Sequence, residues 1–370
     1  MILFMLKLKI MRKAKFFFIV LYILFFNIFV FSEIEYPIDI LCKFPKIIKI
    51  RGDKAYITCY DKVKIYVYSL KNRKIEMSFL KKGEGPSEAK YSPSRNGFKI
   101  FKDYYSVSVS GKIMYFDKKG GLIKSKRHHP KYYGLLPVGN NFVCEQGGMP
   151  DPKNADAKII KRKIVLLGNN FIFGSKLKKK KDLIEYETSF LQRYDFKHEK
   201  FELNMIQEYA GYTVFGEKIY CGKSYEDRGE FHVFDSDGKL IRKFKIEFKK
   251  RKIKGRYKKE SLLFKTEWLK SLNKKPNPII KDVIYLKYYP SFRNFFISDD
   301  KIYMLEYPYD KYIRINIADI YGKVSESKRI YKKNPYRFML EMGDGYYIYD
   351  NALYYLSDTE EGWVLKKMEF

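Results

Sequence analysis

A paired pattern of strands and turns recurs six times along this 370-residue chain, and it constrains the fold more than any other feature. Each unit begins with an apolar stretch, a short polar turn and a second apolar stretch. In order these are IIKIRGDKAYITC, FKIFKDYYSVSV, LLPVGNNFVCEQ, YTVFGEKIYCGK, FFISDDKIYMLEY and FMLEMGDGYYIYD. Roughly twenty residues further on, a similar stretch follows each: IYVYSLKNRKIEM, IMYFDKKGGLIKS, IVLLGNNFIFGS, FHVFDSDGKLIRK, IRINIADIYGKVSES and LYYLSDTEEGWVLKK. Each unit therefore contains two hairpins.

Two hairpins per unit predict a four-stranded antiparallel sheet. Six such sheets predict a β-propeller, in which radial repetition leaves only short, protected sheet edges. Two sandwiches side by side would not explain why one paired pattern recurs six times. Aromatic residues form 18% of the chain, which suits strands because flat rings pack well on a pleated surface. We therefore predict an all-β fold, a six-bladed β-propeller over residues 33–370, with a short helical insertion between blades four and five.

The closure of the ring is open to two arrangements. In the first arrangement, the last blade contains four strands of its own and ends in WVLKKMEF. Residues Ile34–Cys42 could also add to the edge of that blade as an N-terminal clasp.

The segment VFDSDGKLI, Val233–Ile241, could be part of a calcium loop or a hairpin turn. A twelve-residue calcium loop with Gly238 at its sixth position would begin at Val233 and end at Phe244, where an aspartate and a glutamate are needed. Asp235–Gly238 also occupies the same place in its unit as DKKG and DIYG do in theirs. Since Asp and Gly tolerate tight-turn dihedral angles, the sequence predicts a hairpin turn without calcium.

The first 32 residues have the features of a targeting segment. Basic residues between Lys7 and Lys15 precede the apolar run Phe16–Phe31, and Ser32 is a small residue at a suitable cleavage point. We predict a cleaved signal peptide. The alternative is a membrane anchor in residues 16–31, although a spanning helix needs about 20 residues. Either reading places the rest of the chain outside the cytoplasm, in the periplasm, at the cell surface or secreted.

The formal net charge of +31 would suit an anionic partner or surface. However, Lys provides 59 of the 74 basic residues, and abundant Lys beside abundant Ile, Tyr and Phe is also what an AT-rich genome encodes. Arg, the better bidentate reader of phosphate, is not enriched, so we do not expect a nucleic-acid partner. The partner is left as an unknown protein or an anionic ligand, and we expect a monomer.

Four cysteines in an exported chain raise the question of disulfides. Cys59, Cys144 and Cys221 stand at equivalent places in three different units, each a few residues after a polar turn. Equivalent places in separate blades should not bring Cα atoms within the roughly 4.4–6.8 Å that a disulfide requires. We therefore expect these three to be buried and unpaired. Cys42 precedes the first unit, and the pattern does not place it.

The segment FLKKGEGPSEAKYSP follows the first unit. Its Gly83, Gly85, Pro86 and Glu88 resemble a Gly-x-Gly-Pro-Gly-Glu signature that many members of the bacterial exported six-bladed β-propeller family carry at a blade junction. Ser87 replaces the usual third glycine. The resemblance implies a structural role, in which the glycines permit positive φ, the proline stiffens the crossover and the glutamate caps amides. A phosphate cradle would need a following helix, which is not predicted here.

The segment 249–278 interrupts the regular links between blades. Its apolar residues recur at helical spacing, which predicts a helix over Lys258–Leu272. This helix could pack over a propeller face as a lid, or dock a partner or a membrane surface. Our candidate binding residues lie here, for a partly apolar, anionic partner at one mouth of the ring: Arg256, Lys265, Trp268 and Lys270. A second departure is the basic run Lys176–Asp182 in blade three.

Motifs of enzymes are scarce. The sequence contains no Gly-x-Ser-x-Gly, Cys-x-x-Cys or His-Glu-x-x-His, and we expect the pair His128–His129 to be solvated rather than metal-bound. We therefore assign no catalytic residue, cofactor or metal ligand. The leading hypothesis is a non-enzymatic binding or scaffolding propeller. The alternative is a lactonase-like hydrolase or lyase with a metal in the central channel.

Overall fold

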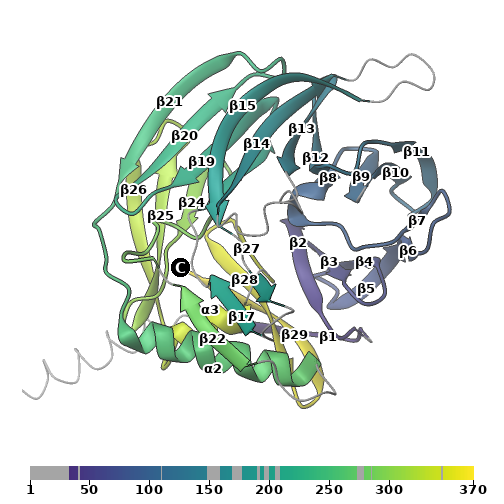
Figure 1. Ribbon diagram of the computed structural model, residues 1–370. Helices are drawn as coiled ribbons and strands as arrows, with labels where there is room; N and C mark the ends of the chain where they lie inside the picture. Colours follow the sequence, from purple (N-terminus) through teal and green to yellow (C-terminus); the bar gives the residue numbers. More distant parts are fainter. Residues whose placement is uncertain are drawn as a thin grey trace, which may run out of the picture.

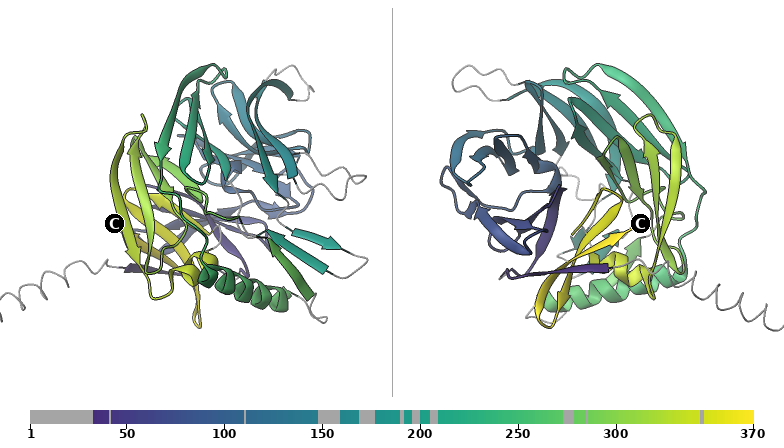
Figure 2. Two further views of the ribbon diagram at one scale, coloured as in Figure 1. Left: turned by 60° about the vertical axis from the view of Figure 1, so that its left-hand side comes forward. Right: turned by 180° about the vertical axis from the view of Figure 1, so that it is seen from behind.

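The computed structural model describes residues 33–40, 42–109, 111–147, 159–168, 177–189, 192–195, 200–204, 209–272, 279–284, 286–342 and 345–370. Six antiparallel sheets are arranged in a ring, as Figures 1 and 2 show. The predicted six-bladed β-propeller is confirmed. Residues 1–32, on which the predicted signal peptide or anchor falls, lie outside the described residues. None of the described helices is long and apolar enough to cross a membrane.

Each of the first five blades consists of four consecutive strands. Blade one contains β2 (Pro45–Arg51), β3 (Lys54–Cys59), β4 (Lys64–Ser69) and β5 (Lys74–Phe79). Blade two contains β8 (Phe98–Ile100), β9 (Tyr104–Val109), β10 (Lys112–Asp117) and β11 (Leu122–Arg127). Blade three contains β12 (Tyr132–Val138), β13 (Asn141–Gly147), β14 (Ile159–Gly168) and β15 (Lys178–Ser189). Blade four contains β18 (Ala210–Phe215), β19 (Lys218–Ser224), β20 (Arg228–Phe234) and β21 (Leu240–Glu247). Blade five contains β23 (Asn294–Ser298), β24 (Lys301–Leu305), β25 (Tyr312–Asp319) and β26 (Val324–Tyr331).

Blade six closes the ring with strands from two distant parts of the chain. It contains β27 (Tyr346–Tyr349), β28 (Ala352–Thr359) and β29 (Gly362–Glu369), and β1 (Glu33–Ile38) pairs antiparallel with β29 as the outer strand. The N-terminal clasp is therefore present, and the prediction that the last blade has four strands of its own is wrong. The segment FMLEM, expected as a strand, belongs to helix α3 (Pro335–Met342).

Helix α3 has a start signal that the strand prediction overlooked. Pro335 suits the first helical turn, because the backbone N–H groups of that turn have no partner within the helix. The N–H that proline lacks is therefore not needed there. The side-chain oxygen of Asn334 accepts a hydrogen bond from the N–H of Arg337 at 3.2 Å, as an N-cap residue does. Tyr336 and Met339 are both buried, and a separation of three residues places them on one face of a helix.

Blade three differs from the prediction in its outer strand. The expected strand FIFGS, residues 171–175, lies outside the described residues. β15 pairs with β14 instead, and it begins within the basic run Lys176–Asp182. The ammonium of Lys163 on β14 lies 3.0 Å from carboxylate oxygens of both Asp182 and Glu185 on β15. Charged side chains suit this position, because an outer strand exposes one edge to water and lysines there oppose pairing with another chain.

The predicted Asp-x-x-Gly hairpin turns share one geometry. In blade four, Asp235 Oδ1 accepts hydrogen bonds of 2.9 and 2.8 Å from the backbone N–H groups two and four residues later. Gly238 in the same turn has a φ of +81°. Asp117 and Asp319 make the same two side-chain bonds in blades two and five. The segment VFDSDGKLI is therefore a hairpin turn, as predicted.

The hydrophobic core lies in the seams between neighbouring blades. Between blades one and two, the Phe79 ring packs against Tyr105 and Phe116, with centroids 5.1 Å apart in both pairs. Turn glycines fit against the same seams. A Cβ added to Gly322 of blade five would lie 2.3 Å from the ring of Phe244 in blade four. The turn glycines Gly120 and Gly238 likewise lie against apolar side chains of the preceding blade.

One disulfide, Cys42–Cys59, joins the clasp to the neighbouring blade, with Cα atoms 5.8 Å apart. Cys42 follows β1, and Cys59 ends β3 of blade one. The prediction that Cys59 is unpaired is therefore wrong, because the comparison among blades left out Cys42, which comes before the first unit. Cys144 and Cys221 are buried and unpaired, as predicted, and burial raises the pKa of both thiols.

The predicted helix between blades four and five is α2 (Gly255–Leu272). Its Tyr257 is buried among Tyr289, Tyr307 and Tyr336, with ring centroids 5.5–6.5 Å away. Beside α2 lies a small sheet of β16 (Gln192–Asp195), β17 (Lys200–Asn204) and β22 (Ile279–Ile284), in which β17 and β22 are parallel. The link between blades three and four is thereby paired with the segment that follows α2.

Candidate functional site

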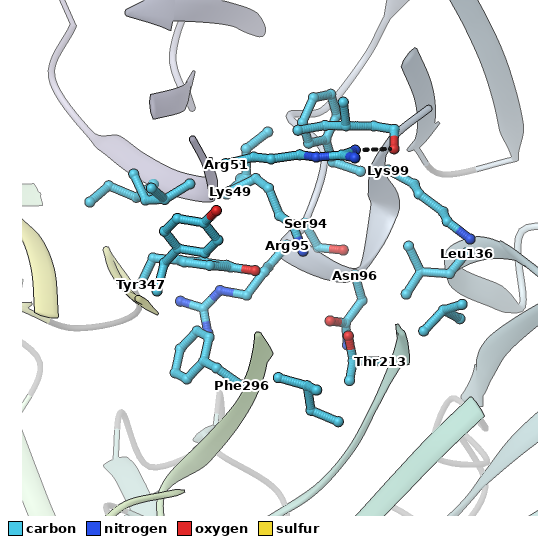
Figure 3. Close-up of a pocket in the computed structure, with 18 of the residues that line it drawn as sticks. Lys49, Arg51, Ser94, Arg95, Asn96, Lys99, Leu136, Thr213, Phe296 and Tyr347 are labelled. Atoms are coloured by element: carbon cyan, nitrogen blue, oxygen red, sulfur yellow. Dashed lines mark hydrogen bonds between the residues drawn. The ribbon is translucent and has the colours of Figure 1, made fainter. Parts of the chain in front are cut away.

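A cavity of about 780 Å³ occupies the centre of the ring. Residues from the first strand of every blade line it (β2, β8, β12, β18, β23 and β27), together with residues 92–96, which lead into blade two. Figure 3 shows part of this lining. Cavities of about 300–1,000 Å³ are the usual size of small-molecule sites. The cavity is therefore the candidate site.

One wall of the cavity, from blades one and two, is cationic. Lys49 and Arg51 come from β2, and Lys99 comes from β8. The Arg51 guanidinium donates a hydrogen bond to the Ile100 carbonyl at 2.9 Å, dashed in Figure 3, and the Lys99 ammonium donates to the Pro137 carbonyl at 2.6 Å. Within the described part of the chain, none of these three cations forms an ion pair with a carboxylate. We call Lys49, Arg51 and Lys99 the cationic wall.

The rest of the lining is aromatic and polar. Phe296, Tyr347 and Thr213 face the cavity from blades five, six and four (Figure 3). The Lys49 ammonium lies 5.4 Å from the centre of the Tyr347 ring, a distance at which a cation is attracted to a ring face. Asp299 is the single carboxylate among the described lining residues. The cavity therefore has an excess of positive charge.

Lys99 has the most perturbed environment of the cationic wall. Its pKa is lowered to about 8, chiefly because burial disfavours the charged ammonium. The like charge of Lys49 lowers the pKa as well, whereas the carboxylate of Glu217 has the opposite effect. A fraction of Lys99 is therefore a neutral amine near neutral pH.

Arg95 crosses the cavity from blade two to blades five and six. It begins the short 3-10 helix η1 (Arg95–Gly97). Its guanidinium lies 4.8 Å from the ring centre of Phe296 and 5.8 Å from that of Tyr347, and it donates a hydrogen bond to the Tyr346 carbonyl. Cation–π contacts and this bond fix the guanidinium within the cavity, and they join opposite sides of the ring.

The Gly-x-Gly-Pro-x-Glu segment lies between blades one and two, where β6 (Lys81–Lys82) pairs with β7 (Glu88–Ala89). Glu88 Oε2 accepts a hydrogen bond from the N–H of Gly85 at 2.9 Å, so the carboxylate does cap an amide. Gly83 has a φ of +152°, as the motif implies. Gly85 does not have a positive φ, and its lack of a side chain matters because an added Cβ would lie 3.0 Å from Glu88 Oε2. Pro86 lies between Gly85 and Glu88 in the sequence.

The candidate binding residues of the insertion do not line the cavity. Arg256 is exposed, and its guanidinium lies 5.7 Å from the ring centre of Tyr336. The backbone of Lys265, Trp268 and Lys270 belongs to α2, but their side chains are outside the described residues. α2 packs against the loop between β24 and β25, where the ring centre of its Tyr257 lies 6.5 Å from that of Tyr307. This contact places the start of the insertion beside blade five, away from the residues that line the cavity.

Groups that could hold a metal are few among the described residues. Cys42, Cys59 and Asp61 lie close together, but the disulfide occupies both sulfurs, so no thiolate is left to bind a metal. His128 is buried rather than solvated as expected, and its Nδ1 lies 3.0 Å from the His129 carbonyl. Burial lowers the pKa of His128, which favours its neutral form.

The cationic wall was not predicted from the sequence. In KIIKIR and FKIF, lysines stand within short apolar first strands. The usable signal was a cation in the first strand of a blade, because that strand faces the channel. A lysine-rich composition concealed it, since similar lysines occur throughout the outer strands.

No protein-family model matches the sequence, and a search of curated proteins found no match. Among solved structures, one similar chain is described as a "putative exported protein" (BF0058) from Bacteroides fragilis NCTC 9343. It is 12% identical over 92% of this chain and 95% of that chain, with a TM-score of 0.49. Another is hydrazine synthase from Kuenenia stuttgartiensis, 10% identical over 85% of this chain and 80% of that chain, with a TM-score of 0.37. BamB from Moraxella catarrhalis is 11% identical over 86% and 70%, with a TM-score of 0.29. Sequence identities and TM-scores this low do not indicate a function. The fold assignment is therefore based on the strand pairing of this chain.

Proposed function

We propose that this protein is an exported, non-enzymatic binding propeller that holds an anionic ligand in its central cavity. The observation that supports the proposal is the cationic wall, with three cations that have no carboxylate partner among the described residues. Lys49 and Lys99 are half-buried, whereas Arg51 is exposed. Half-buried cations that form no ion pair lose hydration and repel one another, and a bound anion would relieve both effects.

Three features support export. The first 32 residues have the pattern of a signal peptide, and the Gly-x-Gly-Pro-x-Glu segment resembles that of an exported propeller family. The disulfide Cys42–Cys59 adds a physical reason, since disulfides persist mainly in oxidising compartments outside the cytoplasm. Retention of residues 16–31 as an anchor would leave the binding function unchanged.

The alternative, a hydrolase or lyase with a channel metal, has less support. Such a metal would need several carboxylate or amide oxygens, and the described lining offers one carboxylate, Asp299, opposite an excess of positive charge. We therefore retain binding as the function that this cavity suits better.

The test is titration calorimetry with acetate, succinate and citrate at low ionic strength. We expect affinity to rise with the charge of the anion, and to fall at least about tenfold in the Lys49→Gln/Arg51→Gln double variant, because each lost contact to a charged group weakens binding by about 1.5–3 kcal/mol. Lys74→Gln, an exposed lysine on β5, is the matched control and should have no effect. Equal binding by wild type and the double variant would refute the proposal.

A further inference from the structure

Lys99 combines several features that a surface lysine lacks. It lies half-buried on the wall of the cavity, beside Leu136 (Figure 3). Its ammonium donates to a backbone carbonyl, that of Pro137, rather than to a carboxylate. The aromatic ring of Phe101 lies 5.1 Å from the nitrogen. The side chain is thus held in place next to about 780 Å³ of space.

The charged groups that act on Lys99 come from two other elements. Lys49 on β2 disfavours a second positive charge, and Glu217, in the turn between β18 and β19, favours it. Arg51 and Arg95 add further positive charge to the same cavity. Desolvation beside another cation is the combination that makes a lysine amine nucleophilic.

The difference in free amine is large. With a pKa of about 8, roughly a quarter of Lys99 is neutral at pH 7.5. An exposed lysine with a pKa of about 10.4 is roughly 0.1% neutral at that pH. The free-amine fraction of Lys99 is therefore far higher than that of the exposed lysines.

We propose that Lys99 is a nucleophilic amine that forms an imine with the carbonyl group of an anionic ligand, such as an oxo acid, held by Lys49 and Arg51. The inference rests on the proposed function for the choice of an anionic ligand, but not for the reactivity of the amine. It adds a covalent mode of capture to the proposed binding.

The reaction needs no oxidant or reductant. The lone pair of Lys99 Nζ attacks the carbonyl carbon, and the π pair moves to the oxygen, which is protonated to give a carbinolamine. Loss of the hydroxyl group with one proton, and of a second proton from nitrogen, gives the imine and one molecule of water. Lys49 and Arg51 would bind the carboxylates of the ligand and so hold its carbonyl near the amine.

The experiment traps the imine on the intact protein. The protein lacking residues 1–32 is incubated at pH 7.5 with either 2-oxoglutarate or the neutral propionaldehyde, in the presence of sodium cyanoborohydride. Peptide mass spectrometry then gives the extent of alkylation at each lysine. We expect Lys99 to react with both reagents at least about tenfold faster than the median exposed lysine, because its free-amine fraction is higher. Its rate should level off above pH 8, whereas the rates of exposed lysines continue to rise.

Variants of Lys49 separate reactivity from anion binding. Lys49→Met removes a like charge, which raises the pKa of Lys99, so its reaction with propionaldehyde at pH 7.5 should slow several-fold. Lys74→Met is the control. If Lys99 reacts no faster than exposed lysines with either carbonyl, the inference is overturned, even where citrate still binds. If propionaldehyde labels Lys99 selectively but 2-oxoglutarate does not, the amine is reactive but the proposed imine with an anionic ligand is overturned. The calorimetric titration then decides separately whether the cavity binds anions.

Discussion

A turn glycine in this propeller serves two purposes at once. Gly322 has a φ of +94°, a conformation that side chains with a Cβ rarely adopt, and it also lies against the ring of Phe244 in the preceding blade. Gly216 has a φ of +59°, but no atom lies within 4 Å of the place where its Cβ would be. The two glycines therefore allow the dihedral requirement and the packing requirement to be measured separately.

We expect Gly216→Ala to lower the free energy of unfolding by about 1–2 kcal/mol, the usual energy of a left-handed conformation. Gly322→Ala should lower it by a further 1–3 kcal/mol or so, because the new methyl group overlaps a packed ring. Phe244 cannot move away freely, since it stacks on Phe231 with centroids 5.2 Å apart. Urea unfolding measures the free energy of unfolding of both variants. Equal losses would show that the side chains between blades four and five move apart without strain.

At the residue scale, sequence reasoning succeeded where chemistry is local. Asp235 was predicted in a turn because its side chain can bond to nearby amides, and it does so. Lys99 was not identified, because its importance comes from Lys49 in another blade and from burial in a cavity that only the closed ring creates. The residues next to Lys99 in the sequence indicate neither its proximity to Lys49 nor its burial in the cavity.

At the scale of elements, the repeat pattern predicted nearly every strand in blades one, two, four and five. It failed where an element departs from the average unit. Apolar residues of FMLEM were assigned to a strand although Asn334–Pro335 is a helix start, and α3 follows from that local signal. β15 was missed because its lysines do not form an apolar stretch. β1 was left open, since the partner of an edge strand can lie anywhere in the sequence.

The disulfide is an element-scale device, because it ties the segment after β1 to the end of β3. A crosslink that closes a loop of this length stabilises a fold by about 3 kcal/mol. Reduction with dithiothreitol should therefore lower the melting temperature of the wild type. Alkylation of the denatured, unreduced protein should modify two thiols, those of Cys144 and Cys221.

The matched control for reduction is the Cys42→Ser/Cys59→Ser variant. It should start at the lower melting temperature and should not respond to dithiothreitol, because its two remaining thiols are already reduced. If reduction leaves the wild type as stable as before, the disulfide is not part of what holds the ring closed.

At the scale of the whole molecule, closure depends on one strand that comes from the opposite end of the chain. β1 covers the edge of β29, with Glu33 opposite Met368 and Ile38 opposite Trp363. The Trp363 indole N–H also donates to the carbonyl of Cys42 at 2.8 Å. A propeller in which the last blade contained all its own strands would have no such tie between its ends. Closure by β1 makes folding of this ring depend on residues directly after the predicted cleavage point.

We predict that a protein lacking residues 1–32 folds, and that one lacking residues 1–41, which keeps Cys42 and its disulfide, is less stable by about 5 kcal/mol. The loss follows from Tyr36, Ile38 and Ile40, all buried, at about 1.5–3 kcal/mol each. The bare edge of β29 should also promote aggregation. Appending residues 33–40 after Phe370 through a short Gly/Ser linker should restore the stability, because the antiparallel register brings the end of β29 beside the start of β1. Urea unfolding and light scattering measure both effects. If the shorter protein matched the longer one without the appended strand, β1 would not be what closes the ring.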